Sequence, residues 1–291
     1  MTTDLLLQRL HAAGIDDILA IAPSAEGMAA VAGIATRRAG GQVFVKTFAT
    51  PQGDDLFARE AEGLRALRQL GGVATPEVVH AGRDALVLSA LQPRPATEAF
   101  WERTAHTLAQ LHMGTISQRY GWHHDNWLGS KPQRNGWDDD GFRFFAEKRV
   151  LRWLEEPRVQ AKLAADERRA LERLCQRLPE LLPPQPACLT HGDCWAQNIL
   201  ATADGEPALI DPAVSYMWAD VDLSHLWCSP HPAEARRLFD VYGQLTGREP
   251  GWLDRLPLIH LRQHMALMAM YDHDWGSTEA VRALVAPFRT R

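Results

Sequence analysis

The sequence predicts an α+β fold of two lobes, a small N-terminal lobe rich in β-strands and a larger, mainly helical C-terminal lobe. The chain has 291 residues, which is long for a single core. Strand-like segments concentrate before residue 92, and helical periodicity dominates after residue 93. Between them Gln92-Pro93-Arg94-Pro95 forms a stiff link, since a residue that precedes proline avoids the helical region. We therefore expect lobes at residues 1–92 and 93–291.

Composition excludes several classes of protein. Hydrophobic residues make up 46% and charged residues 23% of the chain, as in soluble globular proteins. A net charge of −5 gives no basic footprint for nucleic acid, and the apolar runs are too short to cross a membrane. The N-terminus lacks the pattern of a signal peptide, and the four cysteines form no CxxC pair. We expect a cytoplasmic protein with reduced thiols, either a monomer or a homodimer.

Hydrophobic periodicity and turn residues divide the N-terminal lobe into elements. Leu5, Leu6, Leu7 and Leu10 lie on one face of a short helix. A hairpin turn at Ala39-Gly40-Gly41 joins the second and third strands. Strands are expected over Ile18–Ala22, Ala29–Arg37, Gln42–Phe48, Glu77–Ala81 and Ala85–Ser89, with a helix over Asp54–Leu70.

The C-terminal lobe is expected to contain helices joined by long loops. A loop from Met113 to Trp137 follows the first helix. Helices are expected over Thr97–His112, Asp138–Leu154 and Asp166–Leu182, short strands over Ala187–Thr190, Ile199–Ala201 and Ala208–Ile210, and helices again in the final third.

The segment His191–Asn198, followed by Ile210-Asp211-Pro212, carries the strongest chemical signal. Phosphoryl transfer needs a carboxylate that orients and deprotonates the acceptor hydroxyl, together with oxygen ligands that hold magnesium on the nucleotide phosphates. Asp193 and Asn198 can present both groups from one loop, and Asp211 can return to the same cavity after a hairpin. Each acid alone could simply cap a turn. The combined spacing matches a kinase catalytic loop and metal site.

Lys46 and Glu60 form a candidate pair for binding the phosphates of a nucleotide. Lys46 lies in an alternating strand, where a lysine is more often solvated. At the helical period Glu60 falls on the apolar face of the following helix, whereas Glu62 points away from it. A carboxylate on a buried face requires a partner. A strand lysine paired with a helix glutamate is the arrangement that directs a kinase lysine to the α- and β-phosphates.

The candidate phosphate-covering loop, Pro23–Ala29, contains a single glycine. Backbone approach to phosphates usually requires more glycine than this. Ser24 and the Gly27 amide are the candidate contacts, and an ordinary hairpin loop is an equal alternative.

These residues resemble the fructosamine kinases, within the wider group of aminoglycoside and choline kinases that share a protein-kinase-like fold. The segment Tyr120–Trp137 is similar to a loop of that family through Gly121, Asp125-Asn126, Gly129, Pro132-Gln133, Asn135 and Trp137. Ala219–Leu223 is similar to an acidic segment whose Asp222-like residue opens a helix behind the catalytic loop. The resemblance extends from about Ile15 to Phe288.

The resemblance implies an ATP- and magnesium-dependent kinase that phosphorylates a sugar hydroxyl of ketosamines, leading to deglycation. Asp193 would be the catalytic base, Asn198 and Asp211 the magnesium ligands, and Lys46 with Glu60 the phosphate-binding pair. Ser89 stands at the hinge where the family commonly has an acid, and adenine recognition there uses mainly backbone groups. The open alternatives are a kinase for an aminoglycoside, choline or another small hydroxyl acceptor, and a catalytically silent binding protein on the same fold.

The loop from Tyr120 to Trp137 also supplies candidate acceptor contacts. Asp125 and Asn126 can hydrogen-bond sugar hydroxyls. Trp122, Trp137 and Trp195 can offer apolar faces to a ring, although packing in the core is the default for tryptophan. His123 and His124 could bind a metal, but no third ligand is evident at a metal-site spacing. A solvated or hydrogen-bonded role is favoured for both.

Overall fold

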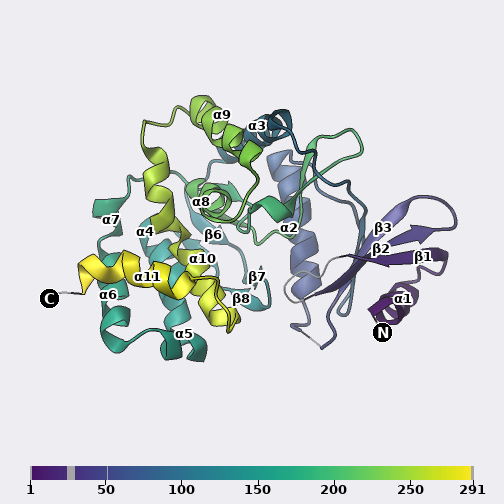
Figure 1. The fold of residues 1–291 in the computed structure, drawn as a ribbon, viewed down its shortest axis with the longest axis horizontal. Coiled ribbons are helices and arrows are strands. Elements are labelled where there is room, and N and C mark those ends of the chain that lie inside the picture. Colours follow the sequence, from purple (N-terminus) through teal and green to yellow (C-terminus); the bar gives the residue numbers. More distant parts are fainter. Residues whose placement is uncertain (1, 25–29, 51, 290–291) are drawn as a thin grey trace.

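The computed structural model of this chain describes residues 2–24, 30–50 and 52–289. It contains an N-terminal antiparallel sheet and a mainly helical C-terminal part, with helix α2 between them (Figure 1). The strands of the sheet follow the order β1-β2-β3-β5-β4. The N-terminal elements are α1 (Thr2–Ala12), β1 (Ile18–Pro23), β2 (Val31–Arg37), β3 (Gln42–Thr47), α2 (Leu56–Gly71), β4 (Val78–Ala81) and β5 (Leu86–Ser89).

The alternation of β3 determines what each face of the sheet carries. Val43 and Val45 are buried in one cluster with Leu6 and Leu10 of α1. The intervening side chains point to the opposite face, where Phe44 packs with apolar residues of α2. Lys46 follows the same alternation and therefore faces α2. The hairpin that joins β2 to β3 contains Gly40 and Gly41, both with positive φ, as its turn requires.

The C-terminal part is built around two apolar clusters. One joins α2 to α3 (Glu98–Gly114), α8 (Asp220–Cys228) and α9 (Arg236–Thr246). The other lies among α5 (Pro157–Lys162), α6 (Ala165–Gln176), α10 (Leu256–Met270) and α11 (Ser277–Val285). Because the first cluster includes Ala66 and Leu67 of α2, this helix packs into both parts of the molecule. Among the helices in the described ranges, none has both the length and the apolar character needed to cross a bilayer.

The segment Met113–Trp137, which was expected to be one long loop, instead contains three short strands and the beginning of a fourth. The loop expectation is therefore corrected. The strands are β6 (Tyr120–Trp122), β7 (Asn126–Leu128), β8 (Lys131–Gln133) and β9 (Gly136–Asp138). β7 pairs only with β8, whereas β6 and β9 join β10 (Cys188–Thr190) and β13 (Ser215–Met217) in the order β10-β13-β6-β9. Strands of three residues are too short to establish a period of two.

Two expected helices are interrupted. The helix expected over Asp138–Leu154 is α4 (Gly141–Phe144), a π-helical segment η1 (Phe145–Val150) and a 3-10 segment η2 (Leu151–Glu155). The helix expected over Asp166–Leu182 is α6 followed by α7 (Leu178–Leu181). Pro179 lies in the first turn of α7, a position where proline begins a helix more readily than it continues one.

Candidate active site

The segment His191–Asn198 connects β10 to β11 (Ile199–Ala201). Its backbone is hydrogen-bonded to a buried carboxylate. Asp222 on α8 accepts hydrogen bonds from the backbone N–H groups of His191 and Gly192, at 2.7 and 2.8 Å. Gly192 has a φ of +80°, and a Cβ there would lie 2.0 Å from the Ala213 carbonyl oxygen. Only glycine fits this position, so the loop conformation is fixed by Gly192 and Asp222 together.

Asp193 lies in the centre of the site and is 21% exposed. Its Oδ2 accepts a hydrogen bond of 3.2 Å from the amide of Asn198. Burial raises the pKa of Asp193 to about 7, with the charges of Asp211 and Asp222 acting in the same direction and that of Arg262 opposing them. A carboxylate with a pKa near neutrality is well suited to accept a proton from an acceptor hydroxyl.

Lys46, Glu60 and Asp211 meet between the two parts of the molecule. The Lys46 ammonium donates to Glu60 Oε2 at 3.0 Å and also contacts Asp211 Oδ1. Burial and the neighbouring Asp211 raise the pKa of Glu60 to about 8. Burial opposes charge on Lys46 as well, but the two carboxylates raise its pKa above the ordinary value. Asp211 is 44% exposed, and Lys46 holds its pKa below the usual range against the effect of burial.

Asn198 and Asp211 supply the oxygen atoms that would suit magnesium. The Asn198 amide nitrogen donates to the Asp193 carbonyl oxygen at 2.8 Å, so its amide oxygen is the atom offered to a ligand. Asp211 follows β12 (Pro207–Leu209) with a φ of +58°, a backbone conformation that is uncommon for residues other than glycine. One neutral and one anionic oxygen ligand fit a hard cation that is shared with phosphate groups.

The other expected nucleotide contacts lie within the N-terminal sheet. Ser24 follows β1, and its backbone N–H donates to the Ala32 carbonyl. The Ser89 hydroxyl accepts a hydrogen bond of 2.8 Å from the Glu77 N–H, which joins the end of β5 to the segment before β4. Gly27 lies outside the described residues.

Asp125 and Asn126, the expected acceptor contacts of the Tyr120–Trp137 segment, are hydrogen-bonded to other residues of the protein. Asn126 is buried, donates to the Val214 carbonyl at 2.8 Å and accepts from Gln133 and Asn135. Asp125 accepts from the Asn135 N–H at 2.7 Å and pairs with Arg134 at 2.8 Å. These contacts engage polar atoms that were expected to meet a sugar, and they connect the short strands to one another.

The three candidate tryptophans occupy different environments. Trp122 is buried and stacks on Tyr216, with ring centroids 5.9 Å apart. Trp137 is partly exposed and tilts over the same tyrosine. Trp195 lies two residues from Asp193 and stacks on His225, with an interplanar angle of 13°. Of the three, Trp195 is the one that stacks on a residue close to Asp193, since His225 Nδ1 lies 3.4 Å from Asp193 Oδ1, and Trp122 packs in the core.

His225 and Gln263 are site residues that the sequence reasoning missed. His225 Nδ1 on α8 lies 3.4 Å from Asp193 Oδ1, and the Gln263 amide on α10 lies 3.5 Å from the same oxygen. Gln263 Oε1 is buried without a partner among the described residues. The signal was available in part, because His260, Arg262, Gln263 and His264 interrupt an otherwise apolar helix, and a buried polar group requires a reason.

Comparison with known proteins agrees with this geometry. The pattern of the fructosamine kinase family matches residues 20–285. A Synechocystis protein assigned as a ketoamine kinase is 32% identical over 220 residues, which are 73% of each chain. A protein-ribulosamine 3-kinase of Oryza sativa subsp. indica is 28% identical over 82% of this chain and 70% of its own.

Solved structures give the same result. A Thermobifida fusca protein assigned as a fructosamine-3-kinase superposes with a TM-score of 0.81 at 26% identity, over 92% of this chain and 94% of its own. An aminoglycoside phosphotransferase, solved with AMP-PNP and hygromycin B, shares the fold alone, with a TM-score of 0.66 at 13% identity over 97% of both chains. From the extent of the family match, this chain belongs to the fructosamine kinase family.

Proposed function

We propose that this chain uses ATP and Mg²⁺ to phosphorylate a sugar hydroxyl of a ketosamine. The observation that carries the proposal is the convergence of Lys46, Glu60, Asp193, Asn198 and Asp211 from separate segments of the chain. Relatives assigned as ketoamine and ribulosamine kinases support the acceptor class. In this proposal residues 1–92 form the lobe that holds the nucleotide, and residues 93–291 supply the catalytic loop and the acceptor site.

Each residue has a defined task in the transfer. The acceptor hydroxyl oxygen attacks the γ-phosphorus of ATP and forms a new P–O bond, while the bond from that phosphorus to the β–γ bridging oxygen breaks and ADP leaves. Asp193 takes the hydroxyl proton, for which its raised pKa is suited. Lys46 binds the nucleotide phosphates, and Glu60 holds the lysine in position.

Asn198 and Asp211 are the residues that would hold magnesium, which when bound neutralises negative charge on the phosphates. The structure supports this assignment through donor chemistry. The Asn198 nitrogen is engaged by Asp193, which leaves its oxygen for the ion. The Asp211 carboxylate stays ionised because Lys46 contacts it. Asp211 would then be shared between the lysine and the ion.

The groups around Asp193 favour a sugar-amine acceptor over an aminoglycoside. Trp195 offers an aromatic face, and His225 and Gln263 offer neutral polar atoms. Burial lowers the pKa of His225 well below its usual range, so the ring is neutral. Arg262 adds a positive charge nearby. A ligand with several ammonium groups would be better served by carboxylates at these positions, whereas sugar hydroxyls suit an indole, an imidazole and an amide.

The test is an acceptor screen with purified protein, ATP and Mg²⁺, in which ADP release is measured. The set comprises fructosyl- and ribulosyl-lysine, kanamycin, and choline as the amino alcohol. We expect turnover with the ketosamines and little with the other two. Efficient phosphorylation of kanamycin or choline without ketosamine turnover would reject the acceptor assignment. No turnover with any acceptor, together with retained ATP binding, would favour the catalytically silent alternative.

A further inference from the structure

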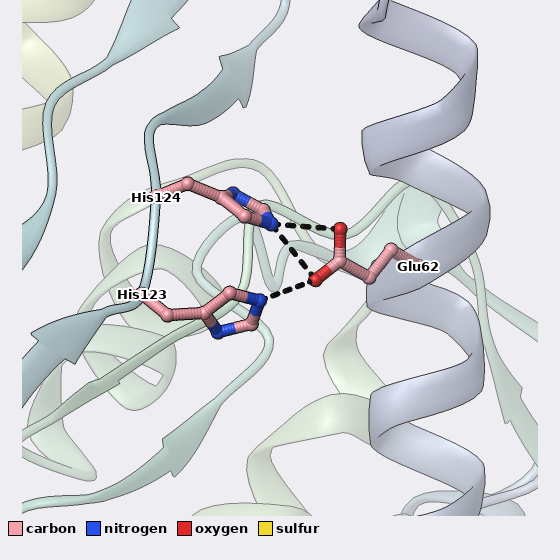
Figure 2. Close-up of side chains that lie close together, drawn as sticks. All are labelled: Glu62, His123 and His124. Carbon is pink, nitrogen blue, oxygen red and sulfur yellow. Dashed lines mark hydrogen bonds and ion pairs between the residues drawn. The ribbon is translucent and has the colours of Figure 1, made fainter.

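A second cluster of polar side chains lies away from Asp193, where α2 meets the bend between β6 and β7. It consists of Glu62 from α2 with His123 and His124 from the bend, and it joins the two parts of the molecule (Figure 2). Adjacent residues of a regular strand point to opposite faces. The backbone bends at this point, and both imidazole rings are turned toward the Glu62 carboxylate.

The distances in this cluster match a metal-binding site. His123 Nε2 lies 2.9 Å from Glu62 Oε1, and His124 Nε2 lies 2.9 Å from Glu62 Oε2. All three ligand atoms lie within 4.8 Å of one another. Tetrahedral zinc with bonds of about 2.0 Å requires ligand atoms about 3.3 Å apart, so small shifts of the side chains would complete the coordination. His123 is 53% exposed, which leaves an approach for the ion and a position for water.

The hydrogen bond at the other nitrogen of His124 supports the same conclusion. His124 Nδ1 lies 3.0 Å from the Asp125 carbonyl oxygen. A carbonyl can only accept, so Nδ1 donates to it, and Nε2 is the nitrogen directed toward Glu62. Histidines that bind metals are commonly oriented in this way by a backbone carbonyl.

Arg59 currently supplies positive charge to the cluster. Its guanidinium lies 2.7 Å from His124 Nε2 and 3.1 Å from Glu62 Oε2. It also donates to Asp55 Oδ2 at 2.9 Å. Because Asp55 remains as a partner, Arg59 can leave the histidine when a divalent ion enters.

We propose that Glu62, His123 and His124 form a binding site for a divalent transition-metal ion of the zinc class, which ties α2 to the C-terminal part of the molecule. Two imidazole nitrogens and one carboxylate with an open fourth position are a ligand set that zinc adopts. Magnesium, which prefers oxygen ligands only, would not be held here. The inference does not depend on the proposed reaction, since none of these residues belongs to the site around Asp193.

The test measures zinc binding by the untagged full chain, without nucleotide and in a buffer that does not chelate zinc. Equilibrium dialysis with metal analysis gives the stoichiometry and affinity, and thermal unfolding gives the stabilisation. We expect one zinc ion per chain and a higher Tm. Removal of a metal ligand is expected to weaken binding by at least about tenfold, in Glu62→Gln and in the double variant His123→Asn with His124→Asn.

Two further variants separate this site from incidental binding to other side chains. His106→Asn removes an exposed histidine of α3 and should leave zinc affinity unchanged. Arg59→Gln removes the competing cation and should strengthen binding. The cysteines are the same in every variant. Equal zinc affinity in wild type and the double histidine variant, or no binding by the wild type, would overturn the proposal and identify the cluster as an ion-pair network alone.

Discussion

Helix α2 presents two glutamates, two residues apart, to two different clusters. At 3.6 residues per turn their side chains point roughly 200° apart around the helix. Glu60 is buried and pairs with Lys46, whereas Glu62 is part-exposed and meets two histidines and an arginine. Both clusters join α2 to residues far away in the sequence, but their surroundings differ.

The difference shows how burial determines the use of a carboxylate. Leaving water is costly for Glu60, which therefore requires a permanent partner, and its pKa is raised to about 8 chiefly by burial. Glu62 keeps contact with solvent, and its charge is shared among groups that can rearrange. The buried cluster is thus suited to a fixed task on every turnover. The exposed cluster is suited to a ligand that binds reversibly.

The largest effect is expected at the centre of the buried site. Asp193→Asn removes the proton acceptor, and general-base catalysis typically contributes about a hundredfold or more. Turnover should fall by at least about that factor, and ATP affinity should change little. Steady-state kinetics together with nucleotide titration measure both quantities. Turnover close to wild type would remove Asp193 from its assigned role.

A matched pair of substitutions on α2 compares the two clusters directly. At a pH above about 8, where Glu60 is ionised, Glu60→Gln weakens a charge-assisted contact to Lys46 that is worth about 1.5–3 kcal/mol, so kcat/KM for ATP should fall by about tenfold or more. Glu62→Gln makes the same chemical change two residues away and should leave kcat/KM near the wild-type value. Equal losses in the two variants would mean that the helix as a whole, rather than the Lys46 contact, supports nucleotide use.

The pH dependence of the reaction tests the raised pKa of Asp193. The base must be ionised, so kcat/KM for the acceptor should fall about tenfold per pH unit below pH of about 7 and level off above it. A rate profile in buffers of constant ionic strength measures this. A flat profile from about pH 5 to 8 would contradict the environment described for this carboxylate.

The raised pKa of Asp193 also makes the stability of the folded protein depend on pH. A carboxyl whose pKa is raised on folding binds more protons in the folded state, so its contribution to stability falls as pH rises from about 4 to about 7. Asp193→Asn removes this dependence. The variant should therefore have a higher Tm than wild type at pH 8, with the difference shrinking toward pH 4. Thermal unfolding of both proteins across this range measures the effect.

The sequence predicted side-chain contacts well where the periodicity of single elements determines them. It predicted contacts poorly where they depend on how distant elements pack together. The alternation of β3 and the period of α2 predicted that Lys46 and Glu60 face each other, and the hydrogen bond of 3.0 Å from Lys46 Nζ to Glu60 Oε2 confirms it. The same reasoning could not find Glu62 as a partner of His123 and His124, because this contact depends on how α2 packs against the β6–β7 bend. The sequence spacing shows no third ligand beside the histidines, and the structure adds Glu62 from α2. The hydrogen-bonded role favoured for both histidines agrees with their contacts to Glu62.

The acceptor contacts expected at Asp125 and Asn126 show the same limit. Their residue types suit sugar hydroxyls, but only the fold reveals that neighbouring residues already engage these groups. His225 and Gln263 had no recognisable spacing to Asp193 because they come from α8 and α10. Short motifs therefore predicted that Asp193 and Asn198 lie together, whereas the approach of His225 and Gln263 depends on helix packing that sequence periodicity does not specify.

The smallest expected effect is a shift in Tm on ligand binding. It distinguishes the two clusters because a different ligand should stabilise each of them. A ligand at one hundred times its Kd adds about 2.7 kcal/mol to the stability of the folded state, which is a Tm shift of several degrees for a chain of this size. Mg²⁺ with ATP should give such a shift in wild type and in the double histidine variant, but a much smaller one in Asp211→Asn. Zn²⁺ alone should show the reverse dependence on these variants, and Mg²⁺ alone should stabilise little, because its proposed oxygen ligands hold it jointly with phosphates. If ATP with EDTA stabilises as much as ATP with Mg²⁺, the assignment of Asn198 and Asp211 as metal ligands fails.

If Asp211→Asn abolishes both the Tm shift with ATP and Mg²⁺ and the Tm shift with Zn²⁺, the two clusters are not independent. The separate roles described for Glu60 and Glu62 on α2 would then be incorrect.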